Sequence, residues 1–261
     1  MIKNYLNIAK AIIMECRNWP FIIFAKIFDL KLENIVLNNG VKIFMGGKIG
    51  KADLSMFSEI WHNKFYNPEG FEINKNDIVF DIGANNGFFS VYAAEKAVNG
   101  KVYAFEPVPY LADKIRKTAS LNNFKNIIVE NLAIGKGTDS KHVFYISKEH
   151  NGCHSLYERK GQLEKIEVSV TNLEKYCKDN NVPRIDFLKL DCEGAEYEII
   201  TKESVDFIKN KIKIISMEHH DDITGHTHSE IVEILQNAGF LIKVSDGFVY
   251  AKNGNKDLTL K

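Results

Sequence analysis

The amino-acid sequence predicts an α/β fold in which a mostly parallel sheet carries a nucleotide-binding βαβ unit behind an N-terminal cap. The first observation is a strand-like run, a glycine turn, a helix-like segment and a second strand ending in an acid, all within residues 77–106. The second is that strand-like and helix-like segments continue in turn up to residue 217, which is typical of a parallel sheet covered by helices. The third is a pair of apolar runs, 240–245 and 248–251, joined by Asp246-Gly247, which predicts a closing hairpin and an antiparallel last strand.

The composition fits one α/β domain with a small appendage. The chain has 261 residues, of which 45% are hydrophobic, enough for a substantial core. Its 34 basic and 34 acidic residues balance, so we predict no nucleic-acid partner. The cysteines form no C-x-x-C pair, which predicts reduced thiols and a cytoplasmic location. They are Cys16, Cys153, Cys177 and Cys192.

The chain is predicted to divide into a cap, residues 1–76, and a nucleotide-binding domain, residues 77–261. The cap is expected to consist of a helix, a hairpin and a second helix. Asn39-Gly40 between two apolar runs indicates the tight turn of the hairpin. Residues 53–66 then show the apolar spacing of a helix.

The first 30 residues combine helical spacing with interrupting charges. Leu6, Ala9 and Ile13 recur at a helical interval, while charged side chains and Pro20 break every apolar run. No transmembrane segment and no export signal is therefore predicted. We expect this helix to pack on the domain or on a partner subunit of a homo-oligomer. Attachment to a membrane surface is the alternative.

The glycine turn after the first strand indicates which nucleotide the βαβ unit would bind. A dinucleotide fingerprint reads G-x-G-x-x-G, so that backbone donors meet a pyrophosphate. Here only Gly83 and Gly87 are present, with Asn85 between them, and Asp81 lies two residues before the first glycine. A carboxylate at this point would repel a pyrophosphate but could accept from an ammonium group, directly or through water. The turn therefore favours S-adenosylmethionine, which carries an ammonium and a sulfonium and no phosphate.

Two further strand ends would complete the cofactor site. Glu106 follows the second strand about 20 residues beyond the turn, from where an acid reaches ribose hydroxyls. The third strand, 126–132, ends where adenine would lie if the ligand crosses the strand tips. The predicted cofactor-binding residues are Asp81, Gly83, Asn85, Gly87, Glu106, Asn131 and Ala133.

A second informative stretch spans residues 185–196. Strand alternation places Lys189 and Asp191 on one face. A lysine inside so apolar a strand needs an anionic partner. Asp191 comes at the carboxyl end of the strand, beside the predicted crevice. Glu196 follows in the first turn of the next helix, where it would complement the helix dipole.

The next strand ends in a polar run, residues 218–222. Asp191 and Glu218, on neighbouring strands, would converge and either hold a divalent cation or accept protons. His220 is interpreted as a hydrogen-bonded surface group. A polar loop, 149–157, would either cover a substrate or form an ordinary surface loop. The predicted catalytic residues are Asp191, Lys189, Glu218 and His219, with Lys189 orienting Asp191 or serving as the base if burial lowers its pKa.

Four segments together resemble the FkbM family of S-adenosylmethionine-dependent methyltransferases. They are DIVFDIGANNGFFS, YAFEPVP, DFLKLDCEGAE and the strand end at Glu218 and His219. The resemblance covers roughly residues 50–252. It implies a class I methyltransferase fold, which is Rossmann-like with a seven-stranded sheet whose last strand is antiparallel. It also implies that Asp81 and the glycine turn contact the methionine part of the cofactor, and Glu106 its ribose.

The resemblance further implies methyl transfer to a hydroxyl oxygen. We expect an S-adenosylmethionine-dependent O-methyltransferase that acts on a sugar or nucleotide-activated sugar in capsule or surface-glycan biosynthesis. A sugar hydroxyl ionises too weakly near neutrality to react unaided, so a base, or a divalent cation that lowers its pKa, is required. The alternatives are a polyketide-like acceptor, an RNA-modifying enzyme on the same fold and a non-catalytic binding module. The balanced charge disfavours RNA, and the intact acidic positions disfavour the binding module.

Overall fold

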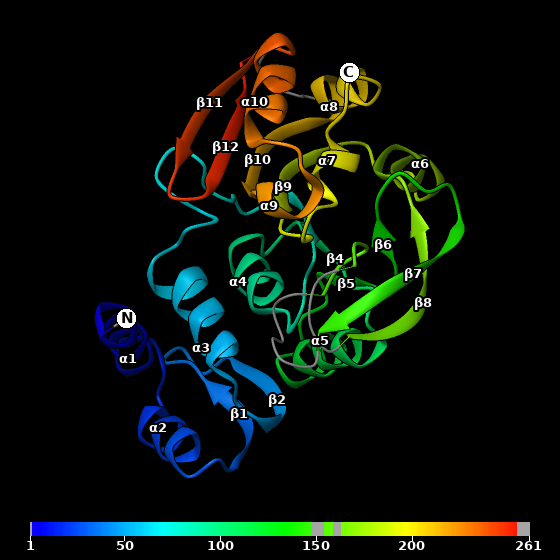
Figure 1. Ribbon diagram of the computed structural model, residues 1–261. Coiled ribbons are helices and arrows are strands. Elements are labelled where there is room, and N and C mark those ends of the chain that lie inside the picture. Colours follow the sequence, from blue (N-terminus) through cyan, green and yellow to red (C-terminus); the bar gives the residue numbers. More distant parts are fainter. Residues whose placement is uncertain (1, 148–153, 159–162, 255–261) are drawn as a thin grey trace.

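A seven-stranded sheet forms the centre of the protein, whose computed structural model describes residues 2–147, 154–158 and 163–254 (Figure 1). In sheet order the strands are β11 (Phe240–Ser245), β12 (Phe248–Asn253), β10 (Ile212–Glu218), β9 (Ile185–Leu190), β3 (Ile78–Ile82), β4 (Lys101–Phe105) and β5 (Ile127–Glu130). β12 runs antiparallel to β10 and β11, and the pairs from β10 to β5 are parallel. The predicted mostly parallel sheet with an antiparallel last strand is confirmed.

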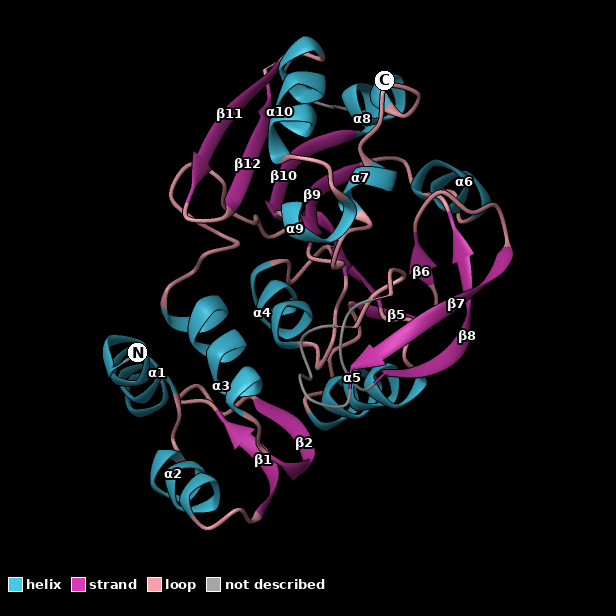
Figure 2. Cartoon of the chain, in the orientation of Figure 1, coloured by secondary structure: helices cyan, strands magenta, loops and turns pink. Residues whose placement is uncertain are grey.

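Helices cover both faces of this sheet (Figure 2). Alternate side chains point to opposite faces, so Val79 and Phe187 join one apolar cluster while Phe80 and Leu188 join another. The first cluster includes α4 (Phe88–Lys96), beside which lies α5 (Pro109–Leu121). The second includes α6 (Leu173–Asp179), α7 (Glu196–Ile199), α8 (Val205–Lys211) and α10 (His228–Asn237), the last preceded by the short α9 (Asp221–Thr224).

The helix after β4 begins later than its sequence indicates. Proline is favoured in the first turn of a helix, so the sequence indicates a start at Pro107, but α5 begins at Pro109. Val108 is extended, with φ −81° and ψ 115°, and its N–H donates to the Glu106 carboxylate at 2.8 Å. This side chain therefore satisfies a donor at the helix start and delays the first turn.

The N-terminal elements form a separate layer beside α4 and α5 (Figure 1). They are α1 (Ile2–Glu15), α2 (Trp19–Ile27), β1 (Lys31–Val36), β2 (Lys42–Lys48), α3 (Lys51–Phe57) and the π-helical turn η1 (Ser58–His62). β1 and β2 pair antiparallel around the expected Asn39-Gly40 turn. The sequence predicted one helix before the hairpin, whereas the structure has two, and Pro20 lies in the first turn of the second, where proline is tolerated. The helix predicted over 53–66 ends at His62.

A three-stranded sheet lies beside the carboxyl end of the central sheet. Its order is β6 (Ala133–Ile134), β8 (Leu163–Thr171) and β7 (Ser140–Ser147). β7 pairs antiparallel with β8 along its whole length, from Ser140 opposite Val170 to Ser147 opposite Leu163. In the part of the chain that the structure describes, no helix is long and apolar enough to cross a membrane.

Candidate active site

The turn between β3 and α4 forms the floor of the site. Gly83 has a φ of +79°, and a Cβ there would lie 1.8 Å from the backbone oxygen of Asp191. Only glycine lets the carboxyl ends of β3 and β9 approach this closely. Gly87 caps α4 with a φ of +78°, and its Cβ would lie 2.8 Å from Ile115. The two glycines therefore let the turn pack closely against the end of β9 and against α5.

A cavity with about 600 Å³ of open space lies over the ends of β3, β4 and β9, and we call it the cofactor cavity. Open α/β sheets bind ligands at this edge. Residues 149–153 of the polar loop lie outside the described residues, but His154 at its end faces this cavity. The lining includes Gly83, Asn85, Phe105, Glu106, Ala133, Phe144, His154 and Leu156.

Glu106 is one of three acidic residues that line the cofactor cavity, with Asp191 and Glu193. It is buried, and its two carboxylate oxygens accept the backbone N–H groups of Asn85 at 2.7 Å and Val108 at 2.8 Å. Burial raises the pKa of this carboxyl to about 7, although the two N–H donors oppose the shift. The carboxylate is thus held rigidly at the edge where ribose hydroxyls were predicted.

The two residues expected near adenine differ in position. Ala133 lines the cofactor cavity. Asn131 does not line it, because its side-chain amide donates to the backbone oxygens of Glu106 and Pro107 at 2.8 and 2.9 Å. Asn131 therefore supports the segment that carries Glu106, which corrects the expected direct contact.

Asp81 and Lys189 form a buried ion pair below the turn. They are cross-strand neighbours on β3 and β9, and their charged atoms lie 3.1 Å apart. Asp81 also accepts from Ser90 of α4 at 2.5 Å, and Lys189 donates to the oxygen of Gly83 at 2.8 Å. Asp81 is fully buried and is not among the residues that line the two cavities, so its contact with the cofactor, directly or through water, stays a prediction.

Lys189 is an ammonium group in this environment. Burial would lower its pKa, but the charges of Asp81 and Asp191 outweigh burial and raise it. This raised pKa favours Lys189 as the residue that orients Asp191 over Lys189 as the base. Its role is to hold two carboxylates, Asp81 at 3.1 Å and Asp191 at 3.5 Å.

A second cavity adjoins the first, shares Gly83, Asn85 and Asp191 with it, and is called the acceptor cavity here. At its inner end the hydroxyl of Tyr66 lies 2.9 Å from Asp191 and 2.7 Å from Glu218. A phenol has one proton and can donate to only one carboxylate. The other short contact therefore needs a proton on a carboxyl. Burial and the neighbouring Asp191 charge raise the pKa of Glu218 to about 7, which makes Glu218 the group that carries it.

His220 closes the other side of Asp191. Its Nδ1 lies 3.1 Å from Glu196, and its Nε2 lies 3.6 Å from Glu193 and 3.9 Å from Asp191. Burial would lower the pKa of His220, but the three carboxylates outweigh burial and raise it to about 10. Asp191 thus lies between two cations, Lys189 and His220, which hold its pKa below the usual range against the effect of burial.

The structure places His219 away from the two cavities and gives Glu196 contacts beyond those expected. His219 lines neither cavity, because its imidazole contacts Asp221 at 2.8 Å and stacks on His228 with ring centroids 4.1 Å apart. Glu196 does more than complement a helix dipole, because its buried carboxylate accepts from the backbone of Cys192 and Gly194 and orients His220. The chain turns after β10 so that His220, and not His219, faces the cavity.

Comparison with known proteins decides the family. A family model described as the methyltransferase FkbM domain matches residues 81–242, more than half of the chain. The chain belongs to the FkbM methyltransferase family. Its relatives include 31-O-demethyl-FK506 methyltransferase FkbM of Streptomyces tacrolimicus, 25% identical over 84% of this chain and 93% of that protein. Methyltransferase 1 of Beauveria bassiana is 23% identical over 82% of this chain and 91% of that protein.

As a member of this family, the FkbM-type protein is an S-adenosylmethionine-dependent methyltransferase. Among solved structures, the precorrin-6y C5,15-methyltransferase of Geobacter metallireducens aligns with a TM-score of 0.41 and 16% identity, over 68% of this chain and 79% of that one. The residues around the cofactor cavity suit this cofactor, because Glu106 can accept from ribose hydroxyls and the turn at Gly83 lines the same cavity.

One set of side chains in this FkbM methyltransferase could also hold a cation. Asp191, Glu193 and His220 each offer one ligand atom, and these atoms lie within 4.8 Å of one another. A protonated imidazole cannot ligate a metal, so an ion would have to displace the proton of His220. A second set, His219 with Asp221 and His228, lies outside both cavities.

Two residues of the FkbM methyltransferase site were missed by the sequence. Tyr66 follows the last helical turn of the N-terminal layer, where no local pattern marks a functional residue. His220 was noticed but treated as a surface group. Its position within a polar run at a strand end was the available signal, because such runs gather at the ligand-binding edge of parallel sheets.

Proposed function

We propose that this FkbM methyltransferase is a cytoplasmic O-methyltransferase that acts on a hydroxyl of a sugar or nucleotide-activated sugar, in capsule or surface-glycan biosynthesis. The observation that carries the proposal is the pair of carboxylates, Asp191 and Glu218, bridged by the Tyr66 hydroxyl beside the cofactor cavity. The sulfonium is already a strong electrophile, so the enzyme must chiefly position the hydroxyl oxygen and remove its proton. The neighbouring carboxylates of Asp191 and Glu218 can accept that proton.

The reaction follows from the charges of this pair. Asp191 stays ionised between Lys189 and His220, and Glu218 loses its proton near neutrality. The ionised pair then accepts the proton of the bound hydroxyl as one unit. The hydroxyl oxygen forms a bond to the methyl carbon while the bond from sulfur to methyl breaks and its electrons remain on sulfur. The products are a methyl ether and S-adenosylhomocysteine, and the proton passes to solvent.

The polar lining of the acceptor cavity supports a polyhydroxyl acceptor. Glu59, Glu193 and Glu218 line it with Asp191, and such carboxylates accept from several sugar hydroxyls at once. The same negative charge would repel a diphosphate, so the nucleotide of an activated sugar would lie outside. Radiolabelled methyl transfer to a panel of free sugars, glycosides and nucleotide-activated sugars tests this. Transfer to none of them, with transfer to another class of acceptor, would overturn the sugar assignment.

A polyketide-like small molecule is the second candidate for the acceptor. The observation in its favour is the relative whose name specifies 31-O-demethyl-FK506, together with the apolar residues Met56, Ile60 and Phe88 in the acceptor cavity. RNA fits less well, because a phosphate backbone would meet the acidic lining. A hydroxylated hydrophobic compound and an RNA oligonucleotide therefore belong in the same panel.

We expect Glu106→Gln to weaken S-adenosylmethionine binding about tenfold to a hundredfold, the usual range for hydrogen bonds to a charged group. The ionised carboxylate is the form that accepts from ribose hydroxyls, so wild-type affinity should rise with pH through about 7, the pKa of Glu106. The variant should bind with no such dependence. Calorimetric titration at several pH values measures both effects. Glu174→Gln, an exposed site on α6, is the control, and wild-type affinity in Glu106→Gln would contradict the assignment.

We expect kcat at saturating cofactor to rise with pH through about 7. Glu218 has its pKa raised from the ordinary value for a glutamate to about 7, so below that pH it is protonated and only Asp191, a weaker base because its pKa is lowered, is left to accept the proton. Glu218→Gln should lower kcat and remove the rise. Saturating cofactor separates this effect from that of Glu106 on binding. An unchanged pH profile in the variant would assign the titration to another group.

A divalent cation, if it acts in the FkbM methyltransferase, would use Asp191, Glu193 and His220. We propose instead that the imidazolium of His220 supplies the positive charge at this point, since its pKa is raised to about 10. Activity is then expected to survive exhaustive chelation. Loss of activity on chelation, restored by one added metal, would assign the position to that ion.

A further inference from the structure

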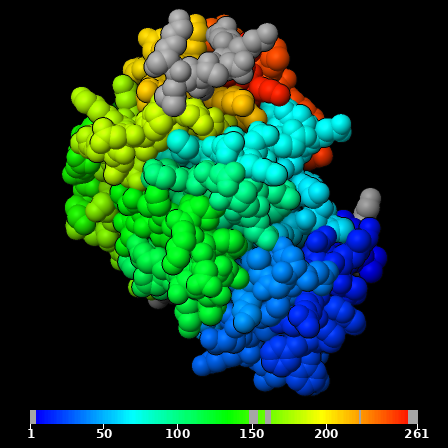
Figure 3. All heavy atoms as spheres, turned by 180° about the vertical axis from the view of Figure 1, so that it is seen from behind, coloured from blue at the N-terminus to red at the C-terminus, as the bar shows by residue number. Residues whose placement is uncertain are grey.

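The first two helices carry an unusual share of the exposed apolar surface. Among the described residues, sixteen large hydrophobic side chains are exposed, and ten of them lie between residues 5 and 30. Exposed apolar residues scattered singly are ordinary, whereas a contiguous concentration marks an interaction surface. Seen from behind, α1 and α2 form one corner of the molecule (Figure 3). We call these ten side chains the N-terminal patch; they are Tyr5, Leu6, Ile13, Met14, Trp19, Phe21, Phe24, Ile27, Phe28 and Leu30.

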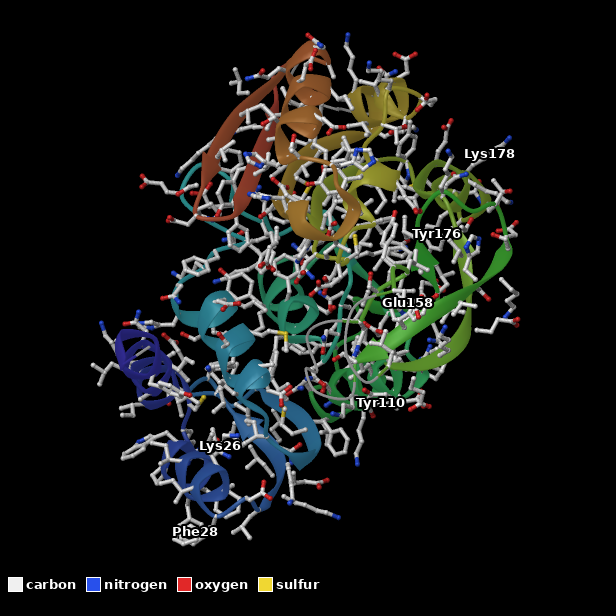
Figure 4. All side chains as sticks on the ribbon, in the orientation of Figure 1. Lys26, Phe28, Tyr110, Glu158, Tyr176 and Lys178 are labelled. Carbon is white, nitrogen blue, oxygen red and sulfur yellow. The ribbon has the colours of Figure 1, made fainter. Side chains whose placement is uncertain are left out.

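The spacing on each helix places these side chains on its outer face. On α2, Phe21, Phe24 and Phe28 follow the i, i+3, i+7 pattern of one helix face, and the rings of Phe24 and Phe28 lie 4.5 Å apart. The adjoining side of α2 carries Ile22 and Ala25, which are buried. Phe28 lies directly after the C-terminal end of α2, and its side chain points away from the body of the protein (Figure 4). The helix thus buries one apolar face and leaves a second one open.

The N-terminal patch has basic side chains around it. Residues 1–31 contain five lysines and arginines and two acids, although the whole chain has no net charge. Lys10, Arg17 and Lys31 among them are exposed. Aromatic and aliphatic groups on one face with cations beside them are typical of helices that lie in the interface of an anionic bilayer. α1 and α2 have only 14 and 9 residues, which is too short to cross one.

The positive charge around the N-terminal patch also favours an anionic bilayer over a second copy of the chain as the binding partner. A two-fold dimer would bring two copies of this net basic region together in one interface. An anionic lipid surface offers opposite charge and requires no matching shape. α1 also contacts the elements that form one side of the acceptor cavity. These are α3 and η1, which carry its lining residues Met56, Glu59 and Ile60.

We propose that the N-terminal patch docks the protein on the surface of an anionic lipid bilayer, with the apolar faces of α1 and α2 among the acyl chains and the basic side chains at the headgroups. The acceptor cavity is then held close to the membrane surface by the contacts of α1 with η1, which include Glu15 and His62 at 3.2 Å. The proposal does not depend on the identity of the acceptor.

Flotation of the full chain with vesicles tests the proposal. The wild type should float with vesicles of phosphatidylcholine and phosphatidylglycerol, and far less with phosphatidylcholine alone or at high salt. Phe24→Ser/Phe28→Ser should lower the bound fraction of protein roughly tenfold or more. Each phenylalanine side chain adds to the binding free energy when it moves from water into the bilayer. Leu241→Ser/Val244→Ser, which removes two exposed apolar side chains from β11, is the matched control and should float as the wild type does.

Two outcomes would overturn the docking proposal. One is a wild-type protein that stays in solution with anionic vesicles. The other is a dimer in solution that binds no vesicles and that Phe24→Ser/Phe28→Ser dissociates, which would assign the N-terminal patch to a second copy. Thermal unfolding of each variant shows that it is folded, and methyl transfer in the absence of vesicles is expected to be unchanged because the patch lies outside both cavities.

Discussion

Replacing Asp191 with asparagine is expected to lower turnover at least about a hundredfold, the usual scale for loss of a general base. The substitution keeps the shape of the side chain but removes the charge that lies between Lys189 and His220. It also removes one of the two carboxylates that the Tyr66 hydroxyl bridges. The remaining Glu218 has no charged neighbour with which to share the proton. Steady-state methyl transfer with saturating cofactor measures the effect.

The control for Asp191→Asn must separate chemistry from folding. Asp206→Asn makes the same chemical change at an exposed position on α8 and should retain full turnover. Cofactor affinity of Asp191→Asn should stay within a few fold of the wild type, because Glu106 and the glycine turn are untouched. Near-normal turnover by a folded Asp191→Asn would remove Asp191 from the mechanism.

Replacing Lys189 with methionine is expected to cost about 3–5 kcal/mol of unfolding free energy, the range for removing one partner of a buried ion pair. Asp81 is fully buried, and without Lys189 it keeps the hydrogen bond from the hydroxyl of Ser90 but no positive charge at contact distance among the described residues. The loss should come mainly from this uncompensated carboxylate and not from lost packing, since methionine fills most of the volume. Urea unfolding of wild type and variant measures the difference.

A second substitution distinguishes these causes. Asp81→Asn in the Lys189→Met background removes the stranded charge and should recover most of the lost stability, whereas a packing defect would remain. Lys209→Met, at an exposed position on α8, is the matched control and should change stability little. A loss below about 1 kcal/mol in Lys189→Met would contradict the buried pair, because that is the range of exposed ion pairs.

The parts of the site that could be predicted from the sequence are those with a local pattern. The turn at Gly83 and Gly87 was evident because strand, glycines and helix are consecutive. Lys189 was correctly expected to need an anion, because an unpaired ammonium in an apolar strand is unfavourable. Its partner Asp81 was assigned to the cofactor instead, since pairing between β3 and β9 cannot be inferred from either segment alone.

The remaining errors come from contacts between distant segments. Tyr66 is 125 residues from Asp191 and 152 from Glu218, and it belongs to a layer that was treated as a cap without a part in the chemistry. His219 and His220 are adjacent, so a choice between them depends on how the chain turns after β10. The backbone of His220 leaves the strand with φ −123° and ψ 63°, and no sequence pattern specifies that turn.

A crystal structure with S-adenosylhomocysteine would test the active-site assignment most directly. We expect the adenosine in the cofactor cavity with its ribose hydroxyls on Glu106, and the sulfur directed to the Asp191, Tyr66 and Glu218 set in the acceptor cavity. A cofactor cavity left empty at saturating ligand, or a ligand bound with its sulfur away from these three side chains, would contradict it.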